Sequence, residues 1–82
     1  MLTPTLSLTG VVTNKHVALN SKSERLAFCL NVNDGSRHIL RRIGGHPFVD
    51  HILQGLLGKT ITADGRIDTS MNTLFMRTWV VH

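Results

Sequence analysis

The sequence predicts a single mainly β domain in which five short strands close into a Greek-key barrel, with one helix between the third and fourth strands. Two observations predict this class. Apolar and polar residues alternate over five short stretches separated by turn-forming residues, and in one stretch alone the alternation gives way to helical spacing. The chain has 82 residues, which suffice for one domain over residues 1–82 and are too few for two.

The first three strands are expected over Thr5–Leu19, Arg25–Asn33 and Ser36–Ile43. Gly10 interrupts the first strand, and a glycine inside a strand often marks a bulge or a sharp bend. In the second strand, alternation places four apolar residues on one face: Leu26, Phe28, Leu30 and Val32. The polar cluster at residues 20–23 predicts a turn, and Asp34-Gly35 is typical of a tight hairpin.

A helix is expected after the glycine pair at residues 44–45. It would begin at Pro47 and end at Gly58, because proline suits the first turn of a helix and glycine suits its end. It would make about three turns, with Gly55 as a weak point in its interior. Six apolar residues fall at helical spacing within it: Phe48, Val49, Ile52, Leu53, Leu56 and Leu57.

The last two strands are expected over Thr60–Asp68 and Leu74–His82, joined by a turn at Ser70–Asn72. The complete order is three strands, one helix and two strands. This order fits the OB-fold, a five-stranded Greek-key barrel. A small SH3-like barrel would lack the helix, so the sequence favours the OB-fold.

The composition indicates a basic domain of a reducing compartment. Nine Lys and Arg face five Asp and Glu, for a net charge of +4, and six of the nine are Arg. Arginine is the better residue for forked contacts to phosphate and for stacking on rings. Cys29 is the only cysteine, which excludes an internal disulfide and favours the cytoplasm. No apolar run is long enough to span a membrane, and no signal peptide is visible.

Catalysis finds little support, and we expect no enzyme activity, no metal and no cofactor. No histidine pair has metal-binding spacing on one element, and His46 and His51 only flank the expected start of the helix. Serine and aspartate residues are scattered in turns without a nucleophile motif. Cys29 lies in an apolar strand and is expected to be a buried structural thiol.

Three stretches resemble the bacterial single-stranded DNA-binding protein family: LSLTGVV, SERLAFCLNV and GKTITADGRIDT. The first strand of that family reads apolar-x-Leu-x-Gly-x-apolar, matched by Leu6, Leu8, Gly10 and Val12. The second strand carries Phe-x-apolar-x-Val, matched by Phe28, Leu30 and Val32. The fourth reads Gly-x-x-apolar and then Gly-x-apolar, matched by Gly58, Ile61, Gly65 and Ile67. The matches run along nearly the whole chain in the right order.

The resemblance implies an OB-fold protein that binds single-stranded DNA in replication or replication restart. It also implies a homodimer or larger homo-oligomer, with replication proteins as further partners. Arg37 and His38 stand where the third strand of the family often begins with an aromatic residue. No acidic tail follows the last expected strand, so the chain is closer to primosomal replication protein N, a shorter member of the family. The loops of this chain are also shorter than is usual in the family, which should shrink a site that wraps a long strand.

Single strands are bound by a basic groove that follows the phosphates and by aromatic or arginine planes that stack on bases. The candidate nucleic-acid-binding residues are therefore Lys15, His16, Lys22, Arg37, His38, Arg41, Arg42, Arg66, Phe75, Arg77 and Trp79. Lys15, His16 and Lys22 lie in or near the loop between the first two strands, which commonly borders the ligand in OB-folds. Surface residues without a role are the alternative for these three.

The third strand gathers Arg37, His38, Arg41 and Arg42. Arg41 and Arg42 must point to opposite faces of a regular strand, so one of them would intrude on the core unless a bulge near Gly44 intervenes. The alternative to a binding role is a solvated, charged edge strand that blocks aggregation.

The closing stretch LFMRTWVVH contains two of the four aromatic residues of the chain. Alternation places Phe75, Arg77 and Trp79 on one face, and it places Leu74, Met76, Thr78 and Val80 on the other. Burying the first face would bury Arg77 without a partner, at a cost of roughly several kcal/mol. We therefore expect Phe75, Arg77 and Trp79 on the outer side, facing either bases or a second subunit.

Two hypotheses for function follow. The first is binding of a single-stranded nucleic acid, either DNA or RNA, with an affinity that falls steeply as salt rises. The second is an OB-fold module for protein interaction in a replication, conjugation or phage assembly, without nucleic-acid affinity of its own. It predicts an apolar patch and binding that is insensitive to salt. Arginine enrichment and the family resemblance favour the first, and the scarcity of aromatic residues favours the second.

Overall fold

The computed structural model describes residues 1–19, 23–45 and 50–82, with the backbone alone for residues 15–19 and 23–26. Within these ranges the chain forms five strands and one helix. Their order is β1 (Leu6–Leu19), β2 (Ser23–Val32), β3 (Arg37–Arg42), α1 (His51–Gly55), β4 (Thr60–Asp68) and β5 (Thr73–Val81).

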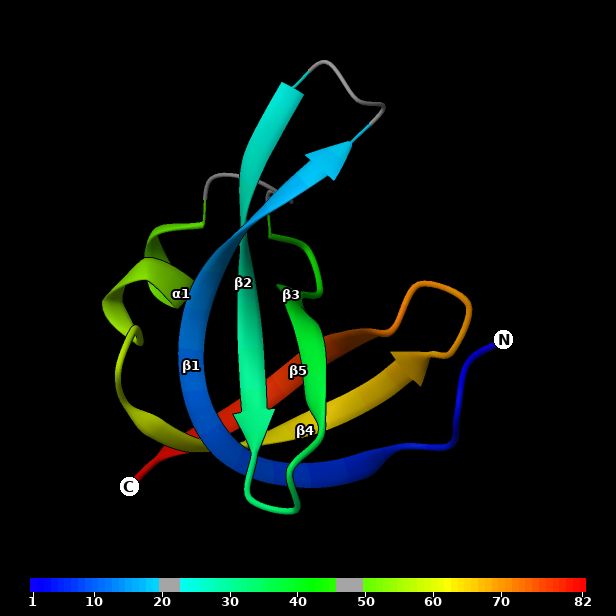
Figure 1. Ribbon diagram of the computed structural model, residues 1–82. Helices are drawn as coiled ribbons and strands as arrows, with labels where there is room; N and C mark the ends of the chain where they lie inside the picture. Colours follow the sequence, from blue (N-terminus) through cyan, green and yellow to red (C-terminus); the bar gives the residue numbers. More distant parts are fainter. Residues whose placement is uncertain (20–22, 46–49) are drawn as a thin grey trace.

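The strands form one sheet that closes on itself in the order β1-β2-β3-β5-β4 (Figure 1). β3 and β5 run parallel, whereas the pairs β1–β2, β1–β4, β2–β3 and β4–β5 are antiparallel. The helix follows β3 and precedes β4. The predicted class is therefore confirmed: a mainly β, five-stranded closed sheet with one helix between the third and fourth strands, consistent with an OB-fold.

β1 closes the ring because it pairs along both of its edges. Residues 6–11 pair with β4, and residues 10–19 pair with β2. Where the two pairings meet, a Cβ on Gly10 would overlap the carbonyl oxygen of Asn31 and lie 2.8 Å from the Cα of Val32. Only glycine permits so close an approach of two backbones. β1 curves around the barrel, and its far end continues with β2 as a two-stranded ribbon (Figure 1).

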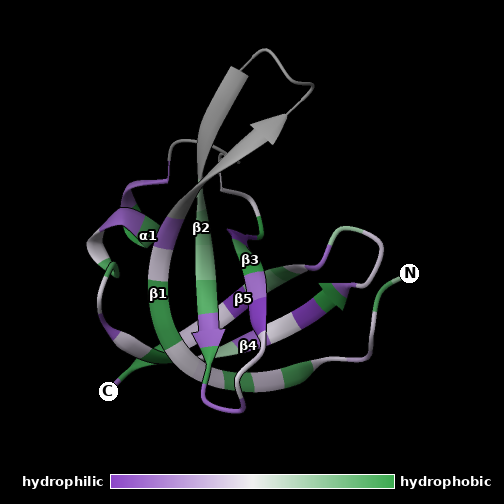
Figure 2. Cartoon of the chain, viewed as in Figure 1, coloured by the Kyte–Doolittle hydropathy of each residue, from purple (hydrophilic) through white to green (hydrophobic). Residues whose placement is uncertain are grey.

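The core lies inside the ring and under the helix. Its buried members are Val12, Leu30, Leu40, Leu53, Leu56, Ile61, Ala63, Leu74 and Met76. Half-buried residues that pack against it are Leu8, Phe28, Val32, Leu57, Ile67 and Trp79. Figure 2 shows hydrophobic and hydrophilic residues alternating along the strands. The predicted inward face of β2 is confirmed at Phe28, Leu30 and Val32, and Cys29 is buried as expected.

The helix is shorter than the sequence predicted. Asp50 has extended backbone angles, φ −127° and ψ 103°, and its carboxylate accepts the N–H groups of Ile52 and Leu53 at 3.0 and 3.1 Å. Asp50 is therefore the N-cap of α1, and its extended backbone contradicts the predicted continuous helix at this position. The predicted start at Pro47 lies outside the described residues. No helix within the described ranges is long and apolar enough to cross a membrane.

Two of the three predicted turns between strands are present, and residues 20–22 of the third lie outside the described residues. Asp34-Gly35 closes the β2–β3 hairpin, with Gly35 at a φ of +94°. Residues 69–72 turn the chain between β4 and β5, and Asn72 has a φ of +48°. The Asn72 side chain donates to the carbonyl of Arg37 at 2.9 Å, and its Oδ1 lies 2.6 Å from Nδ1 of His38. The second turn is thereby fixed to the start of β3.

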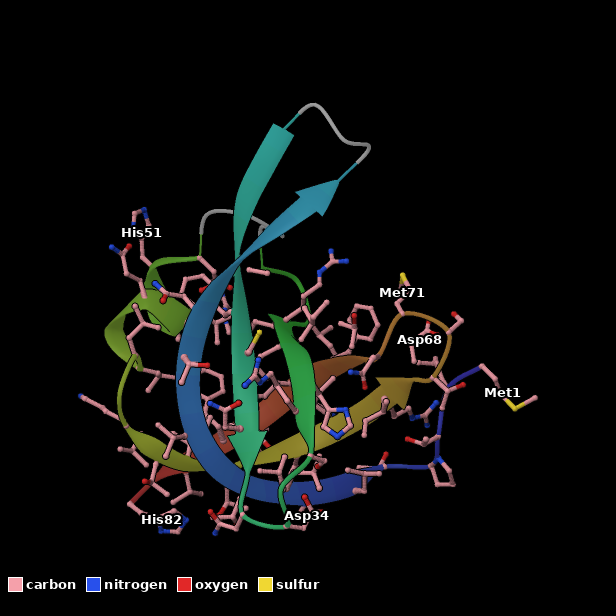
Figure 3. The ribbon with its side chains drawn as sticks, in the orientation of Figure 1. Met1, Asp34, His51, Asp68, Met71 and His82 are labelled. Carbon is pink, nitrogen blue, oxygen red and sulfur yellow. The ribbon has the colours of Figure 1, made fainter. Side chains whose placement is uncertain are left out.

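The N-terminal segment lies beside the end of β4. The Thr3 N–H donates to the carbonyl of Ile67 at 2.9 Å, and the Ile67 N–H donates to the hydroxyl of Thr3 at 3.0 Å. The Thr69 N–H donates to the carbonyl of Met1 at 3.0 Å. Met1 and Asp68 lie at the same end of the molecule, with the terminal amino group 3.5 Å from the Asp68 carboxylate (Figure 3). These contacts make the segment part of the surface along β4.

Candidate functional site

Three candidate residues form a row across the outer face of β3, β5 and β4. The register pairs Arg41 with Phe75 across the parallel strands, and it pairs Phe75 with Arg66 across the antiparallel ones. The guanidinium carbon of Arg41 lies 5.3 Å from the centroid of the Phe75 ring. Such a cation–π contact is worth about 0.5–1 kcal/mol at an exposed site, and it holds the guanidinium over the ring. We call Arg41, Phe75 and Arg66 the Arg-Phe-Arg row.

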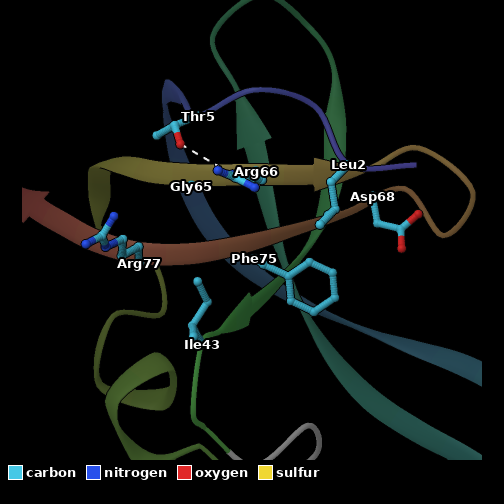
Figure 4. A pocket seen from close by; sticks show the side chains of 8 residues that line it. All are labelled: Leu2, Thr5, Ile43, Gly65, Arg66, Asp68, Phe75 and Arg77. Atoms are coloured by element: carbon cyan, nitrogen blue, oxygen red, sulfur yellow. Dashed lines mark hydrogen bonds between the residues drawn. The ribbon is translucent and has the colours of Figure 1, made fainter.

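A groove of about 620 Å³ opens beside this row (Figure 4). Its lining residues are Leu2, Thr5, Ile43, Gly65, Arg66, Asp68, Phe75 and Arg77. Leu2 and Ile43 are 51% and 58% exposed, so large apolar side chains face solvent here. In Figure 4, Arg77 lies toward one end and Asp68 toward the other, with Ile43, Phe75 and Leu2 between them.

A β-bulge in β5 shapes the groove. Asp64 pairs with Thr78, but the next residue, Gly65, pairs with Met76, so Arg77 is an extra residue on β5. A Cβ on Gly65 would overlap the carbonyl oxygen of Phe75, which means that β5 passes closer to β4 here than a side chain would allow. Bulges commonly redirect a side chain. Arg77 and Thr78 are consecutive in the chain and both exposed.

The same bulge overturns one prediction about the last strand. Phe75, Arg77 and Trp79 were expected on one outer face, with Val80 on the inner face. Because the extra residue inverts the alternation, Trp79 pairs with the buried Ala63 and packs against the core. Val80 instead faces outward and is 60% exposed. The predicted shared face is therefore wrong for Trp79, and Phe75 is the ring that lines the groove.

Arg41 and Arg42 point to opposite sides of β3, as a regular strand requires. The Nε of Arg42 lies 3.0 Å from Oδ2 of Asp50, whose side chain is 2% exposed. A Cβ on Gly45 would overlap that same carboxylate oxygen, so glycine leaves room for the ion pair. Arg42 thus reaches the helix cap instead of intruding on the core. β3 also pairs with both β2 and β5, so the alternative of an exposed edge strand is wrong.

The remaining candidates lie away from the groove or outside the described residues. Arg37 is exposed on the same side of β3 as Arg41, roughly 13 Å along the strand, and donates from Nε to the Asn31 side chain at 2.9 Å. His38 contacts the β4–β5 turn through Asn72. The side chains of Lys15, His16 and Lys22 lie outside the described residues.

The charges of the groove are separated along its length. Arg66 and Arg77 are exposed, and the Nε of Arg66 lies 3.5 Å from the hydroxyl of Thr5. At the other end, Asp68 accepts hydrogen bonds from the hydroxyl and the N–H of Ser70 at 2.6 and 3.0 Å. The hydroxyl bond is the main reason that the pKa of Asp68 is lowered, so this carboxyl stays ionised well into the acid range. Arg77 and Asp68 place opposite charges at the two ends of the groove, Arg66 lies between them (Figure 4), and the terminal amino group lies 3.5 Å from the Asp68 carboxylate.

The structure thus brings together Arg41, Arg66, Phe75 and Arg77 from the candidate set. It adds groove residues that no sequence pattern indicated as binding residues: Leu2, Thr5, Ile43, Gly65 and Asp68. Gly65 was interpreted from the sequence as a match to the family motif, although a glycine within a strand is also a signal of a bulge. Among the described residues, no group of three His, Cys, Asp or Glu side chains is arranged to hold a metal ion.

Comparisons with known protein families, with curated proteins and with solved structures found no match to this chain. The resemblance to the single-stranded DNA-binding family therefore rests on the residues quoted for it.

Proposed function

We propose that this protein binds single-stranded DNA on the outer face of β3, β5 and β4. The observation that carries the proposal is the Arg-Phe-Arg row, in which an aromatic ring is flanked by two arginines on neighbouring strands. The Phe75 ring, with the Arg41 guanidinium over one side of it, offers a flat surface on which a base stacks. Arg66 and Arg77 then reach the phosphates on either side of that base. The net charge of +4 supports the approach of an anionic strand.

The resemblance adds a biological setting to this proposal, replication or replication restart in the manner of primosomal replication protein N. The resemblance also implies that two copies of the protein associate as a homodimer. Among the described residues, Phe75 is the aromatic side chain that faces outward in the groove, while Phe28 and Trp79 pack on the core. One protomer therefore contacts a short stretch of strand, and a second copy would lengthen the binding surface.

The test is fluorescence anisotropy of labelled oligo-dT at low salt. We expect Phe75→Leu to weaken binding by about 5- to 150-fold, the equivalent of the 1–3 kcal/mol that base stacking on a ring contributes. Trp79→Phe is the matched control, since it alters a ring that faces the core, and we expect its affinity to stay within about twofold of the original. Equal losses in both variants, or no binding by the original protein, would contradict the proposal.

One observation favours a second candidate function, an OB-fold module for protein interaction. Leu2 and Ile43 expose apolar side chains in the groove, next to the half-buried Phe75. An apolar patch of this kind is also typical of a surface that receives a protein partner. Salt separates the two candidates, because binding of a strand weakens steeply with salt whereas binding through an apolar patch does not.

A further inference from the structure

The two ends of the groove favour one orientation for an anionic ligand. Arg77 is exposed at one end and Arg66 is exposed near the middle, whereas Asp68 keeps its negative charge at the other end. One oxygen of Asp68, Oδ1, is also engaged by Ser70 and by the terminal amino group. A phosphate would be attracted to the two arginines and repelled by the carboxylate. The negative charge of a ligand therefore belongs beside Arg66 and Arg77.

The space between these ends suits a flat, weakly polar group. Leu2 and Ile43 present their side chains from opposite parts of the chain, the N-terminal segment and the end of β3, and the Phe75 ring lies between them (Figure 4). A volume of about 620 Å³ falls within the range of about 300–1,000 Å³ that small-molecule sites occupy. A ligand that joins a flat ring to an anion matches both parts of the groove, and a nucleotide has this composition.

The geometry points to a pocket that takes one unstacked nucleobase of the bound strand. The base lies between Leu2, Ile43 and the Phe75 ring, and the adjoining phosphates lie on Arg66 and Arg77. This inference rests on the proposed function and specifies which part of the strand occupies the groove. It also predicts a preference for single strands, because a base in a duplex must first be unpaired and unstacked, at a cost of a few kcal/mol.

The experiment compares two labelled oligonucleotides of equal length and charge, one wholly abasic and one with a single central thymine. For the original protein, the added base should tighten binding by about 5- to 150-fold, which is the stacking contribution of one base. In Ile43→Ser, which removes one apolar wall, we expect most of this gain to be lost. Val80→Ser is the matched control, because Val80 is 60% exposed against 58% for Ile43 and lies outside the groove. It should keep the full gain.

The outcomes separate this inference from the function on which it rests. Suppose that oligo-dT binds but the thymine raises the affinity equally in the original protein, Ile43→Ser and Val80→Ser. The base then lies elsewhere, and the inferred base pocket is wrong. A gain that is lost equally in both variants overturns the pocket too, because the loss is then not local to the groove. If the original protein binds no oligonucleotide at low salt, both the inferred base pocket and the proposed function are contradicted. An apolar side chain of a protein partner would then be the occupant to test.

Discussion

Replacing Gly65 with alanine is expected to lower the free energy of unfolding by about 3 kcal/mol, the upper part of the range for overpacking a closely packed site. The added Cβ would overlap the carbonyl oxygen of Phe75 and lie 2.9 Å from its carbonyl carbon. Both atoms belong to the backbone, so relief requires β4 and β5 to separate at the bulge. A domain of this length has a total stability of about 4–12 kcal/mol, so the loss is large. Urea unfolding followed by circular dichroism measures it.

Gly55→Ala is the control for this substitution. Gly55 lies in α1 with open space around its Cβ position and without a positive φ, so alanine there should stabilise the protein by about 0.5–1 kcal/mol. The bulge account would be contradicted if Gly65→Ala changed the free energy of unfolding by less than about 1 kcal/mol.

Asp50→Ala is expected to cost about 3.5–5 kcal/mol of the free energy of unfolding, the sum of the loss of the cap and of the ion pair. Its carboxylate caps α1 through two backbone N–H groups and binds Arg42 at 3.0 Å, while its side chain is only 2% exposed. Loss of an N-cap costs about 0.5–2 kcal/mol. Breaking a buried ion pair costs about 3–5 kcal/mol, and the lower part of that range applies here because Arg42 is 25% exposed and can reach water. Chemical denaturation measures the change.

Two further variants divide this cost between the cap and the ion pair. Asp50→Asn keeps a good capping side chain and removes the charge, so its loss should be smaller than that of Asp50→Ala. Arg42→Met in the Asp50→Ala background removes the unpaired cation and should recover part of the stability. If the double variant is no more stable than Asp50→Ala, the ion pair is not what Asp50 contributes.

The strands could be predicted from the sequence because each has a regular period. Phe28, Leu30 and Val32 alternate on β2 and face the core, and the order of elements led to the closed five-stranded sheet. The turns were predictable for a chemical reason. Gly35 takes a φ of +94°, a conformation that glycine adopts without strain.

The helix start was not predicted because two signals compete in that stretch. Proline at position 47 suits a first helical turn, but an aspartate three residues later is a strong N-cap. The cap prevails because Asp50 also pairs with Arg42 from β3, a contact between distant residues that no local pattern reveals. That contact also explains how two consecutive arginines fit a central strand.

The face of Trp79 was not predicted because a single extra residue inverts every later position in a strand. Alternation read from Leu74 holds as far as the bulge and fails beyond it. The groove depends on the same bulge, and its apolar walls come from Leu2 and Ile43, which lie far apart in the chain. Such a site becomes visible only when the fold brings the N-terminal segment beside β4.

The central claim, that a single strand binds through Arg66 and Arg77, is tested most directly by titrating binding against salt. For single strands, log K falls with log salt by about 0.7 for each phosphate neutralised. We predict that Arg66→Gln and Arg77→Gln each flatten this slope by about 0.7, and that the double variant flattens it by about 1.4. Lys59→Gln, which removes an exposed charge outside the groove, should leave the slope unchanged. Slopes that match the original protein in the double variant, or oligo-dT that fails to bind at low salt, would contradict the account.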